Sequence, residues 1–355
     1  MDNNNSIKAE SLQPLTPLDF AAFLSGDEKA QLDFAHSLIE SFRTIGIVKL
    51  RSKDLPGCNI AGLFDMAERF FELDTKTKMV AAHPPQASPH RGYSFIGQEK
   101  ISGITGFADG KLDKTALQDI KVRDTLQLNN SLTNITVIRS LSTWALPKTV
   151  TSPTSGQRTS ISHTFGGLME SQYEALEHVK HHILRALAMG LGLPKEFFIP
   201  LHHKSHHEMR LLHYPSTTVG AFKNGKTRIA DHTDFGSVTL LFQDATGGLE
   251  ERHPASGKYV GIESCQQECL VQLGDCFQRW TGGYLWALPH RVTMPIGTDP
   301  EDDEARIPER FSIAFFGKPN RDVNVGNLTY PQFQEVKYNS LTAGEYNNMK
   351  LLKTY

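Results

Sequence analysis

Two residues that could bind one metal ion, His232 and Asp234, lie just before the apolar segment VTLLF at 238–242. A His-x-Asp triplet is weak evidence alone, because a chain with 15 histidines readily contains one by chance. In an extended strand, however, side chains two residues apart project to the same face, so this imidazole and carboxylate could meet at one point. The alternative is a pair of ordinary polar residues where a loop enters a strand.

A third ligand would have to come from another strand. His290 is the best candidate, because it follows the turn-rich LGDCFQRWTGG and begins a new strand in HRVTMP. Two histidines and one carboxylate leave three coordination positions open, as in the facial triad of non-haem Fe(II) oxygenases. The rival histidines lie in LHHKSHHE at 201–208. We expect those in a solvated loop, with adventitious metal binding as the alternative.

A second pair could bind a carboxylate. Arg310 and Ser312 in ERFSIAFF are again two residues apart, so a guanidinium and a hydroxyl share one face of a strand. Arg158 and Ser160 have the same spacing, so this pattern is also weak alone. The later pair, Arg310 and Ser312, differs in that it lies in an apolar strand after His290. The ordinary alternative for Arg310 is a surface salt bridge.

The elements that must position these residues divide the chain into a helical and a strand-rich part. Apolar spacing predicts helices at 28–44, 59–72 and 169–191, with a short strand at 47–50. Residues 81–165 are rich in Ser, Thr, Pro and Gly and are expected to be loops. After 208, short apolar or alternating segments separated by turn signals predict an antiparallel sandwich or barrel, with the helices packed outside it. A last helix is expected within 342–354.

Composition limits the possible partners and location. The 37 Lys and Arg nearly balance the 39 Asp and Glu, which gives no electrostatic footprint for nucleic acid. We see no apolar run long enough to cross a membrane and no secretory signal, so a cytoplasmic protein is expected. The four cysteines lack the paired spacing of common zinc sites and fit reduced thiols.

Taken in order, HTD at 232–234, HRV at 290–292 and RFS at 310–312 resemble the 2-oxoglutarate and Fe(II)-dependent dioxygenases of the isopenicillin N synthase-like branch. Within that branch the chain is most similar to fungal thymine 7-hydroxylase and its relatives. Further matching segments are RGYSFIGQEK at 91–100, DIK at 119–121, RLLHYP at 210–215 and the whole of 232–249. The likeness covers about 16–121 and 170–355.

The resemblance implies a mainly β chain with helices (α+β). Its core would be a double-stranded β-helix, or jelly roll, flanked by N-terminal and central helices. It implies that His232, Asp234 and His290 bind iron. It also implies that Arg310 and Ser312, helped by Tyr214, hold the distal carboxylate of 2-oxoglutarate.

The same resemblance places Arg210, Phe235 and Phe316 at the substrate. The residue after HTD is a tyrosine in the likeness and Phe235 here, which removes a hydroxyl that could bind the substrate. Plain core packing is the alternative for both phenylalanines.

The resemblance implies an enzyme that oxidises a C–H bond of a small molecule by hydroxylation. The small molecule would be either a pyrimidine or a secondary-metabolite intermediate. Fe(II), 2-oxoglutarate and O2 would be required, with ascorbate in support, and succinate and CO2 would be released. The alternatives are an isopenicillin N synthase-like Fe(II) oxidase that does not use 2-oxoglutarate, and a catalytically silent ligand-binding homologue. The sequence does not indicate an oligomeric state.

The expected organisation has five parts. Residues 122–168 depart from the likeness and are interpreted as an insert or an artefact of gene prediction, with the artefact favoured. The remaining parts are an N-terminal region at 1–121, a supporting helix and loop at 169–205, the catalytic core at 206–320 and a C-terminal helical region at 321–355.

Overall fold

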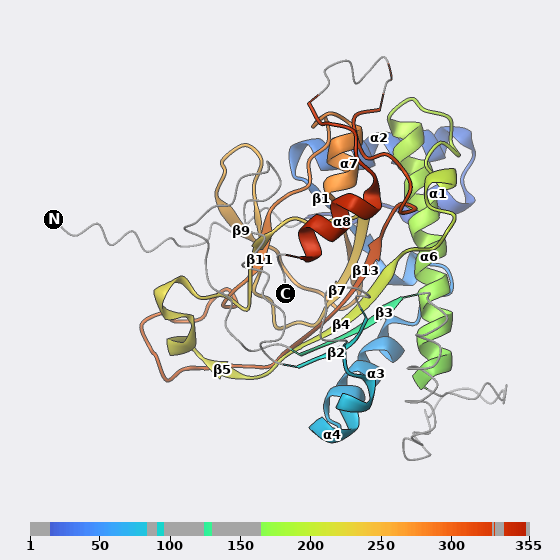
Figure 1. Ribbon diagram of the computed structural model, residues 1–355. Coiled ribbons are helices and arrows are strands. Elements are labelled where there is room, and N and C mark those ends of the chain that lie inside the picture. Colours follow the sequence, from blue (N-terminus) through green and yellow to red (C-terminus); the bar gives the residue numbers. More distant parts are fainter. Residues whose placement is uncertain are drawn as a thin grey trace.

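A computed structural model describes residues 15–83, 91–95, 124–129, 165–328, 330 and 337–352 of the chain (Figure 1). The matching segments 96–100 and 119–121, and most of 122–168, lie outside these residues. The division of the chain into five parts stays a prediction. No helix in the described ranges combines the length and apolar character needed to cross a membrane.

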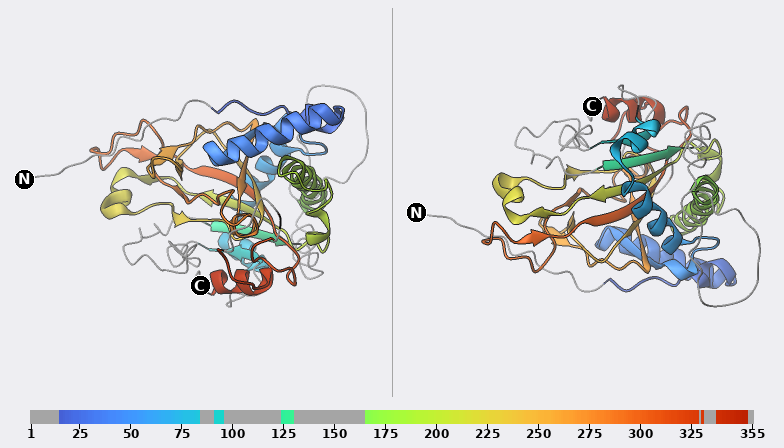
Figure 2. Two further views of the ribbon diagram at one scale, coloured as in Figure 1. Left: turned by 90° about the horizontal axis from the view of Figure 1, so that it is seen from above. Right: turned by 90° about the horizontal axis from the view of Figure 1, so that it is seen from below.

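Five of the described helices come before the strands of the site in the sequence. They are α1 (Phe20–Ser25), α2 (Glu28–Thr44), α3 (Ile60–Phe71), α4 (Thr75–Lys78) and α6 (Phe165–Gly190). Asp27 begins α2 by accepting a hydrogen bond from the backbone N–H of Ala30. The α2 and α6 helices pack on each other, while α3 and α6 contact strands of the larger sheet. In Figure 2 the long helices α2 (blue) and α6 (green) lie outside the strands.

The larger sheet has seven strands in the order β1-β10-β7-β13-β4-β3-β2, and every neighbouring pair is antiparallel. Its strands are β1 (Ile47–Arg51), β2 (Gly92–Ser94), β3 (Asp124–Asn129), β4 (Glu208–Tyr214), β7 (Val238–Gln243), β10 (Glu268–Leu273) and β13 (Arg310–Gly317). The smaller sheet has the order β6-β11-β8-β9. Its strands are β6 (Ile229–His232), β8 (Leu249–Arg252), β9 (Tyr259–Gly261) and β11 (His290–Val292).

The chain alternates between the two sheets. It passes from β6 in the smaller sheet to β7 in the larger, back to β8 and β9, and then through β10 and β11 to β13. This alternation makes neighbours of strands that are distant in sequence. The short strands β5 (Thr217–Thr218) and β12 (Arg306–Ile307) form a separate pair. Helix α7 (Asp275–Trp280) follows β10. Helix α8 (Ala343–Leu351) lies near the C-terminal end of the described residues.

Apolar clusters lie against both faces of the larger sheet. Leu240 and Phe242 of β7 belong to the cluster under the helices, whereas Leu241 belongs to the cluster between the sheets. All six residues of β7 are therefore buried. A polar residue on the inner face of such a strand must find a partner inside the protein.

The structure differs from expectation in the region thought to be loops. Strands β2 and β3 lie within 81–165, and β3 pairs with β2 and β4 in the larger sheet. The central helix begins at Phe165, four residues earlier than expected. Short strands of this kind depend on cross-strand partners, which local composition does not reveal.

The expectation of a solvated histidine loop is wrong for His202 and His207, whose side chains are fully buried. The His202 ring hydrogen-bonds Ser237 Oγ and the Phe198 carbonyl, each at 2.8 Å. His207 Nε2 lies 2.6 Å from the buried Lys180 Nζ. These partners replace water, so the polar sequence does not imply exposure.

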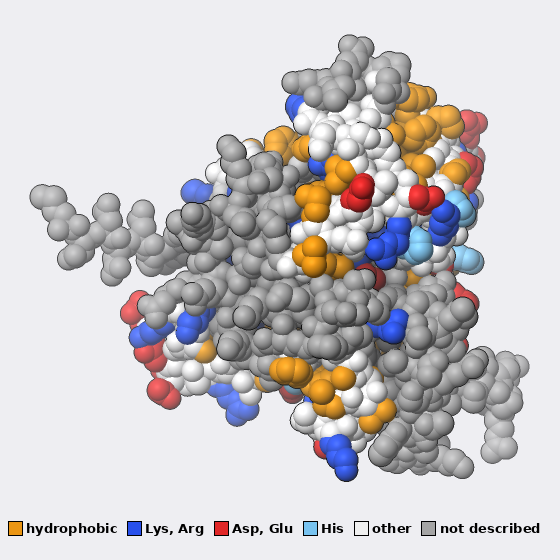
Figure 3. Space-filling view, viewed as in Figure 1, with side chains coloured by type: hydrophobic (Ala, Val, Ile, Leu, Met, Phe, Trp, Pro, Cys, Tyr) orange, Lys and Arg blue, Asp and Glu red, His pale blue; other side chains and the backbone are white. Residues whose placement is uncertain are grey.

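The four cysteines are free thiols. On the described surface visible in Figure 3, acidic and basic side chains are interspersed, in keeping with the near-balanced charge of the sequence.

Candidate metal centre

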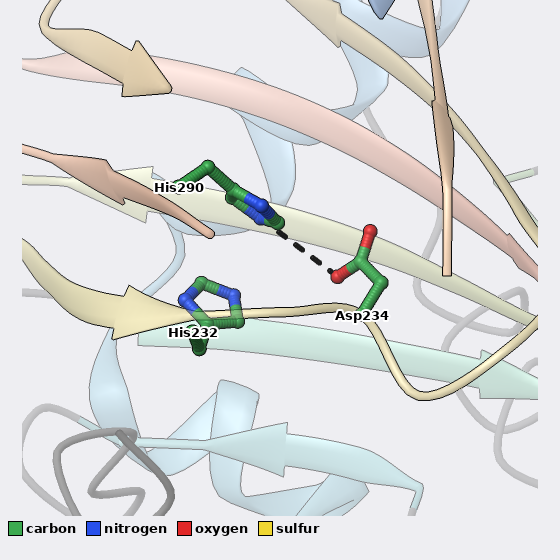
Figure 4. Close-up of side chains that lie close together, drawn as sticks. All are labelled: His232, Asp234 and His290. Atoms are coloured by element: carbon green, nitrogen blue, oxygen red, sulfur yellow. Dashed lines mark ion pairs between the residues drawn. The ribbon is translucent and has the colours of Figure 1, made fainter. Parts of the chain in front are cut away.

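The structure brings His232, Asp234 and His290 to one point (Figure 4). His232 ends β6 and His290 begins β11, and the antiparallel pairing of these strands places the two residues directly opposite each other. Their ring centroids are 4.4 Å apart. His290 Nε2 lies 3.8 Å from Asp234 Oδ1, and one ligand atom from each residue lies within 4.8 Å of the others.

Asp234 reaches this point in a different way from that expected. Strand β6 ends at His232, so Asp234 projects from the following loop and not from the same strand face. Asp234 and His290 are buried and His232 is half-buried. A group of two imidazoles and a carboxylate in this setting has the composition of a metal site with open positions.

Hydrogen bonds fix how the three side chains face the common point. His232 Nδ1 bonds the Ala230 carbonyl at 2.8 Å, and His290 Nδ1 bonds the Leu288 carbonyl at 3.2 Å. Because a carbonyl oxygen can only accept, each Nδ1 carries the proton and each Nε2 keeps its lone pair. The Thr239 hydroxyl donates to Asp234 Oδ2 at 2.5 Å, which directs Oδ1 toward the histidines.

The loop that carries Asp234 is held by its backbone. The N–H of Asp275 donates to the Asp234 carbonyl at 2.8 Å, and the N–H of Cys276 donates to the Gly236 carbonyl at 3.0 Å. A Cβ atom at position 236 would collide with the Gly317 carbonyl oxygen, so glycine is needed there. The loop therefore has little freedom to move the carboxylate.

The C-terminal helix supports the same loop through Lys350. Its ammonium group pairs with the Asp275 carboxylate at 2.8 Å and donates to the Thr233 hydroxyl at 3.2 Å. It also lies 5.2 Å from the centroid of the Phe235 ring. A residue near the end of the chain thus contacts the segment between two of the candidate ligands.

Arg310, Ser312 and Tyr214 form a second cluster in the same cavity. Arg310 Nη1 donates to Ser312 Oγ at 3.1 Å, and Nη2 donates to Gln243 Oε1 at 2.9 Å. The Arg310 Cζ atom lies 5.0 Å from the centroid of the Tyr214 ring. The buried Nε of Arg310 has no hydrogen-bond partner among the residues described. A carboxylate entering here would meet a guanidinium with a donor to spare.

One cavity joins this cluster to the three candidate ligands, and its lining includes Arg310, Ser312, Tyr214, His232, Asp234 and His290. Strand register gives the separation of the two arginines in the lining. Arg310 pairs with Tyr214 and Ala314 pairs with Arg210, four residues further along β13. At about 3.3 Å per residue, Arg210 therefore lies roughly 13 Å along the sheet from the Arg310 row. The cavity has cationic groups at two separate places.

Two of the three expected substrate residues line the cavity and the third does not. Arg210 and Phe316 both line the cavity, and Arg210 Cζ lies 5.7 Å from the centroid of the Phe316 ring. Phe235 is half-buried against the inner apolar cluster and does not line this cavity. The ammonium group of Lys350 lies over its ring.

Sequence reasoning missed several polar residues around the cavity. Thr239, Gln243 and Gln272 lie on buried strands, and Gln272 Nε2 donates to the buried Glu251 carboxylate. Burial raises the pKa of Glu251 to about 7. The available signal was a polar residue inside an otherwise apolar strand, as in VTLLFQ and ECLVQL.

Two family descriptions match the chain. Residues 205–319 match the 2OG-Fe(II) oxygenase superfamily, and residues 15–137 match the N-terminal region of non-haem dioxygenases in morphine synthesis. A 2-oxoglutarate-Fe(II) type oxidoreductase of Metarhizium majus is 38% identical over 346 residues, covering 95% of this chain and 94% of that protein. A proline hydroxylase of Petromyces alliaceus is 36% identical over 346 residues, with coverage of 95% and 98%.

Solved structures agree with these matches. The Neurospora crassa thymine 7-hydroxylase in complex with 2-oxoglutarate and thymine is 26% identical and has a TM-score of 0.74. The likeness covers 98% of this chain and 100% of that one. It confirms the predicted fold, a jelly roll of antiparallel strands flanked by helices.

Proposed function

The chain belongs to the 2-oxoglutarate–Fe(II) oxygenase superfamily, and from this we propose that it oxidises a C–H bond of a small molecule by hydroxylation. The enzyme class and its cofactors follow from the family. The observation that best supports their placement is that one cavity contains both a two-histidine, one-carboxylate cluster and a buried Arg–Ser pair.

The residues present suit an iron site made by His232, Asp234 and His290. Both imidazoles have Nδ1 committed to a backbone carbonyl, and Thr239 occupies one oxygen of the carboxylate. Each of the three residues can therefore present one ligand atom to a common metal ion. These three residues would hold the metal and would leave room beside it for the cosubstrates.

The residues proposed to hold 2-oxoglutarate are Arg310, Ser312 and Tyr214. The guanidinium and the hydroxyl already touch, so both can donate to one carboxylate without a change of rotamer. Their burial removes competing water, which strengthens a charge-assisted hydrogen bond. This end of the cavity is suited to the carboxylate far from the 2-oxo acid group.

The proposed substrate lies at the opposite part of the cavity, against Arg210 and Phe316. A planar or apolar body would pack on Phe316, and an oxygen acceptor would face Arg210. A pyrimidine or a secondary-metabolite intermediate fits these demands. The complex of thymine with the Neurospora enzyme and the proline hydroxylase relative both point to compact substrates. Phe235 stays a predicted contributor through the loop that it shares with Asp234.

Bound iron, 2-oxoglutarate and O2 supply an oxidative decarboxylation that releases succinate and CO2 and oxidises the substrate C–H bond. The protein's residues bind and orient the reactants. Apolar side chains such as Leu212, Leu241 and Val292 wall the cavity and limit the access of water. The segment 206–320 contains all of these groups and is the proposed catalytic core.

The proposal is tested by adding Fe(II) and 2-oxoglutarate to the protein without oxygen. We expect a weak visible charge-transfer band from chelation of the metal by the 2-oxo acid. His232→Ala should abolish the band because one of three protein ligands is lost. His36→Ala, at an exposed position on α2, is the matched control and should leave it unchanged.

A screen of pyrimidines and small metabolites, with succinate as the readout, then identifies the substrate. A wild-type protein that gives no band, or a band that survives His232→Ala, would contradict the assignment of the metal site. Succinate formation that no tested compound stimulates would contradict the proposed substrate classes while leaving the metal site intact.

A further inference from the structure

Arg228 is a buried cation to which the proposed function assigns no role. Its side chain has 0% exposure. Nη2 donates to the Pro308 carbonyl at 2.6 Å and contacts the Pro215 carbonyl at 3.4 Å. Nε and Nη1 have no hydrogen-bond partner among the described residues. The side chain thus connects the end of β4 to the start of β13 and retains unused donors.

Arg228 and Arg310 lie beside the same aromatic ring. Their Cζ atoms are 5.8 and 5.0 Å from the centroid of Tyr214. The hydrogen-bond acceptors of both guanidinium groups are neutral, namely proline carbonyls, the Ser312 hydroxyl and the Gln243 amide. Two positive charges are therefore buried close together without a hydrogen-bonded carboxylate in the described structure.

The surroundings make this arrangement unfavourable in the absence of an anion. Burial, and next the charge of Arg310, lower the pKa of Arg228 to about 10. Asp244 attracts Arg228 through space, but its oxygens accept the backbone N–H groups of Phe311 and Thr246. A negatively charged ligand at this end of the cavity would offset the repulsion between the two arginines.

We propose that Arg228 is a positioning residue for the second carboxylate of the 2-oxo acid and makes this end of the cavity selective for dicarboxylates. The proposal rests on the proposed function, because Arg310, Ser312 and Tyr214 must first bind that carboxylate. Arg228 does not itself line the cavity. It acts by fixing the Tyr214 ring and by adding a second positive charge behind it.

A purely structural role for Arg228 has a different consequence. If the residue only joined β4 to β13, its loss would distort the cavity and weaken every 2-oxo acid alike. If its charge selects the distal carboxylate, the loss should affect 2-oxoglutarate but spare an analogue that lacks this group. 2-Oxopentanoate is such an analogue, because it has the same five-carbon chain with a methyl group in place of the distal carboxylate.

The experiment is calorimetric titration of the full chain, loaded with Mn(II) so that no turnover occurs, with each of the two acids. Arg228→Gln removes the charge and keeps a side chain that can bond the Pro308 carbonyl. We expect its Kd for 2-oxoglutarate to rise about tenfold, as for one charge acting over roughly 10 Å in a protein. The Kd for 2-oxopentanoate and the Kd for Mn(II) should stay within about threefold of the wild type.

Two variants complete the design. Arg228→Lys retains the charge and should restore binding of 2-oxoglutarate to within about threefold of the wild type. Arg306→Gln removes an exposed arginine from β12 and should alter neither titration. Should Arg228→Gln fail to fold, Arg228→Met takes its place in the same measurements.

Equal weakening of both acids, weaker binding of Mn(II), or an unchanged Kd for 2-oxoglutarate in Arg228→Gln would overturn the role of Arg228. A wild-type protein that binds Mn(II) but not 2-oxoglutarate would instead overturn the proposed function. The two failures are therefore distinguishable.

Discussion

Replacing Lys350 by methionine tests whether the C-terminal helix stabilises the loop that carries Asp234. The ammonium group of Lys350 and the carboxylate of Asp275 are 2.8 Å apart, with side-chain exposures of 1% and 3%. Methionine keeps the apolar stem but leaves the carboxylate buried without its charge partner. Removal of one partner of such a pair costs about 3–5 kcal/mol in the free energy of unfolding.

This loss converts to a measurable shift of the melting temperature. With an unfolding entropy of about 2.1 cal/mol/K per residue, a chain of 355 residues should melt about 4–7 °C lower. Thermal unfolding followed by circular dichroism measures the shift. Lys29→Met is the matched control, because Lys29 pairs with Asp33 at 2.7 Å but is 84% exposed. We expect no resolved shift for that variant, since exposed pairs contribute little.

A double variant tests the electrostatic explanation. Lys350→Met with Asp275→Asn removes both charges, so it should melt higher than Lys350→Met alone. The Tyr346 hydroxyl, which donates to Asp275 Oδ2 at 2.8 Å, retains an acceptor in both proteins. The reasoning is refuted if Lys350→Met melts like Lys29→Met, or if the second substitution lowers the melting temperature further.

Three further predictions concern groups at and beyond the site. Thr239→Val should weaken Fe(II) binding about 10- to 100-fold in a metal titration, because the hydrogen bond to Asp234 is lost, and Thr239→Ser should retain it. Arg310→Met should raise the Kd for 2-oxoglutarate about 100-fold in calorimetry with Mn(II), because the buried carboxylate loses its charged donor. A change under threefold would contradict the assignment. Burial lowers the pKa of Lys180 from 10.5 to about 7. Between these pH values the unfolded chain binds a proton that the folded chain does not, so the free energy of unfolding should rise with pH. Lys180→Met should lack this rise in melts across the same range, and equal slopes in the two proteins would exclude Lys180 as its source.

Much of the site could be predicted because its signals are local. His232 and Asp234 are two residues apart, as are Arg310 and Ser312, and the order of these pairs around His290 identifies the family. Most of the long helix α6 was equally visible, since its apolar residues recur at helical spacing from Met169 onward. These features depend on side-chain type and short spacing alone.

Other features needed partners that are distant in the sequence. From the sequence, His202 and His207 were expected to be solvated. No residue close to them in the sequence indicates that Ser237 and Lys180 will replace water as their partners. Strand β3 exists through its pairing with β2 and β4, whose sequences are separated from it by long segments. Propensity within a short polar window cannot anticipate such pairing.

The sequence by itself determined which residues could bind iron and a carboxylate, because those chemistries require particular side chains in a particular order. Tertiary structure decided how they meet. The pairing of β6 with β11 places His290 opposite His232, and the loop after β6 turns Asp234 toward them. It also placed Lys350 against the loop that carries Asp234 and placed Arg228 beside Tyr214, with both cations outside the cavity lining. Their contributions arise from burial and from charges brought together by packing, and neither is encoded in the spacing of neighbouring residues.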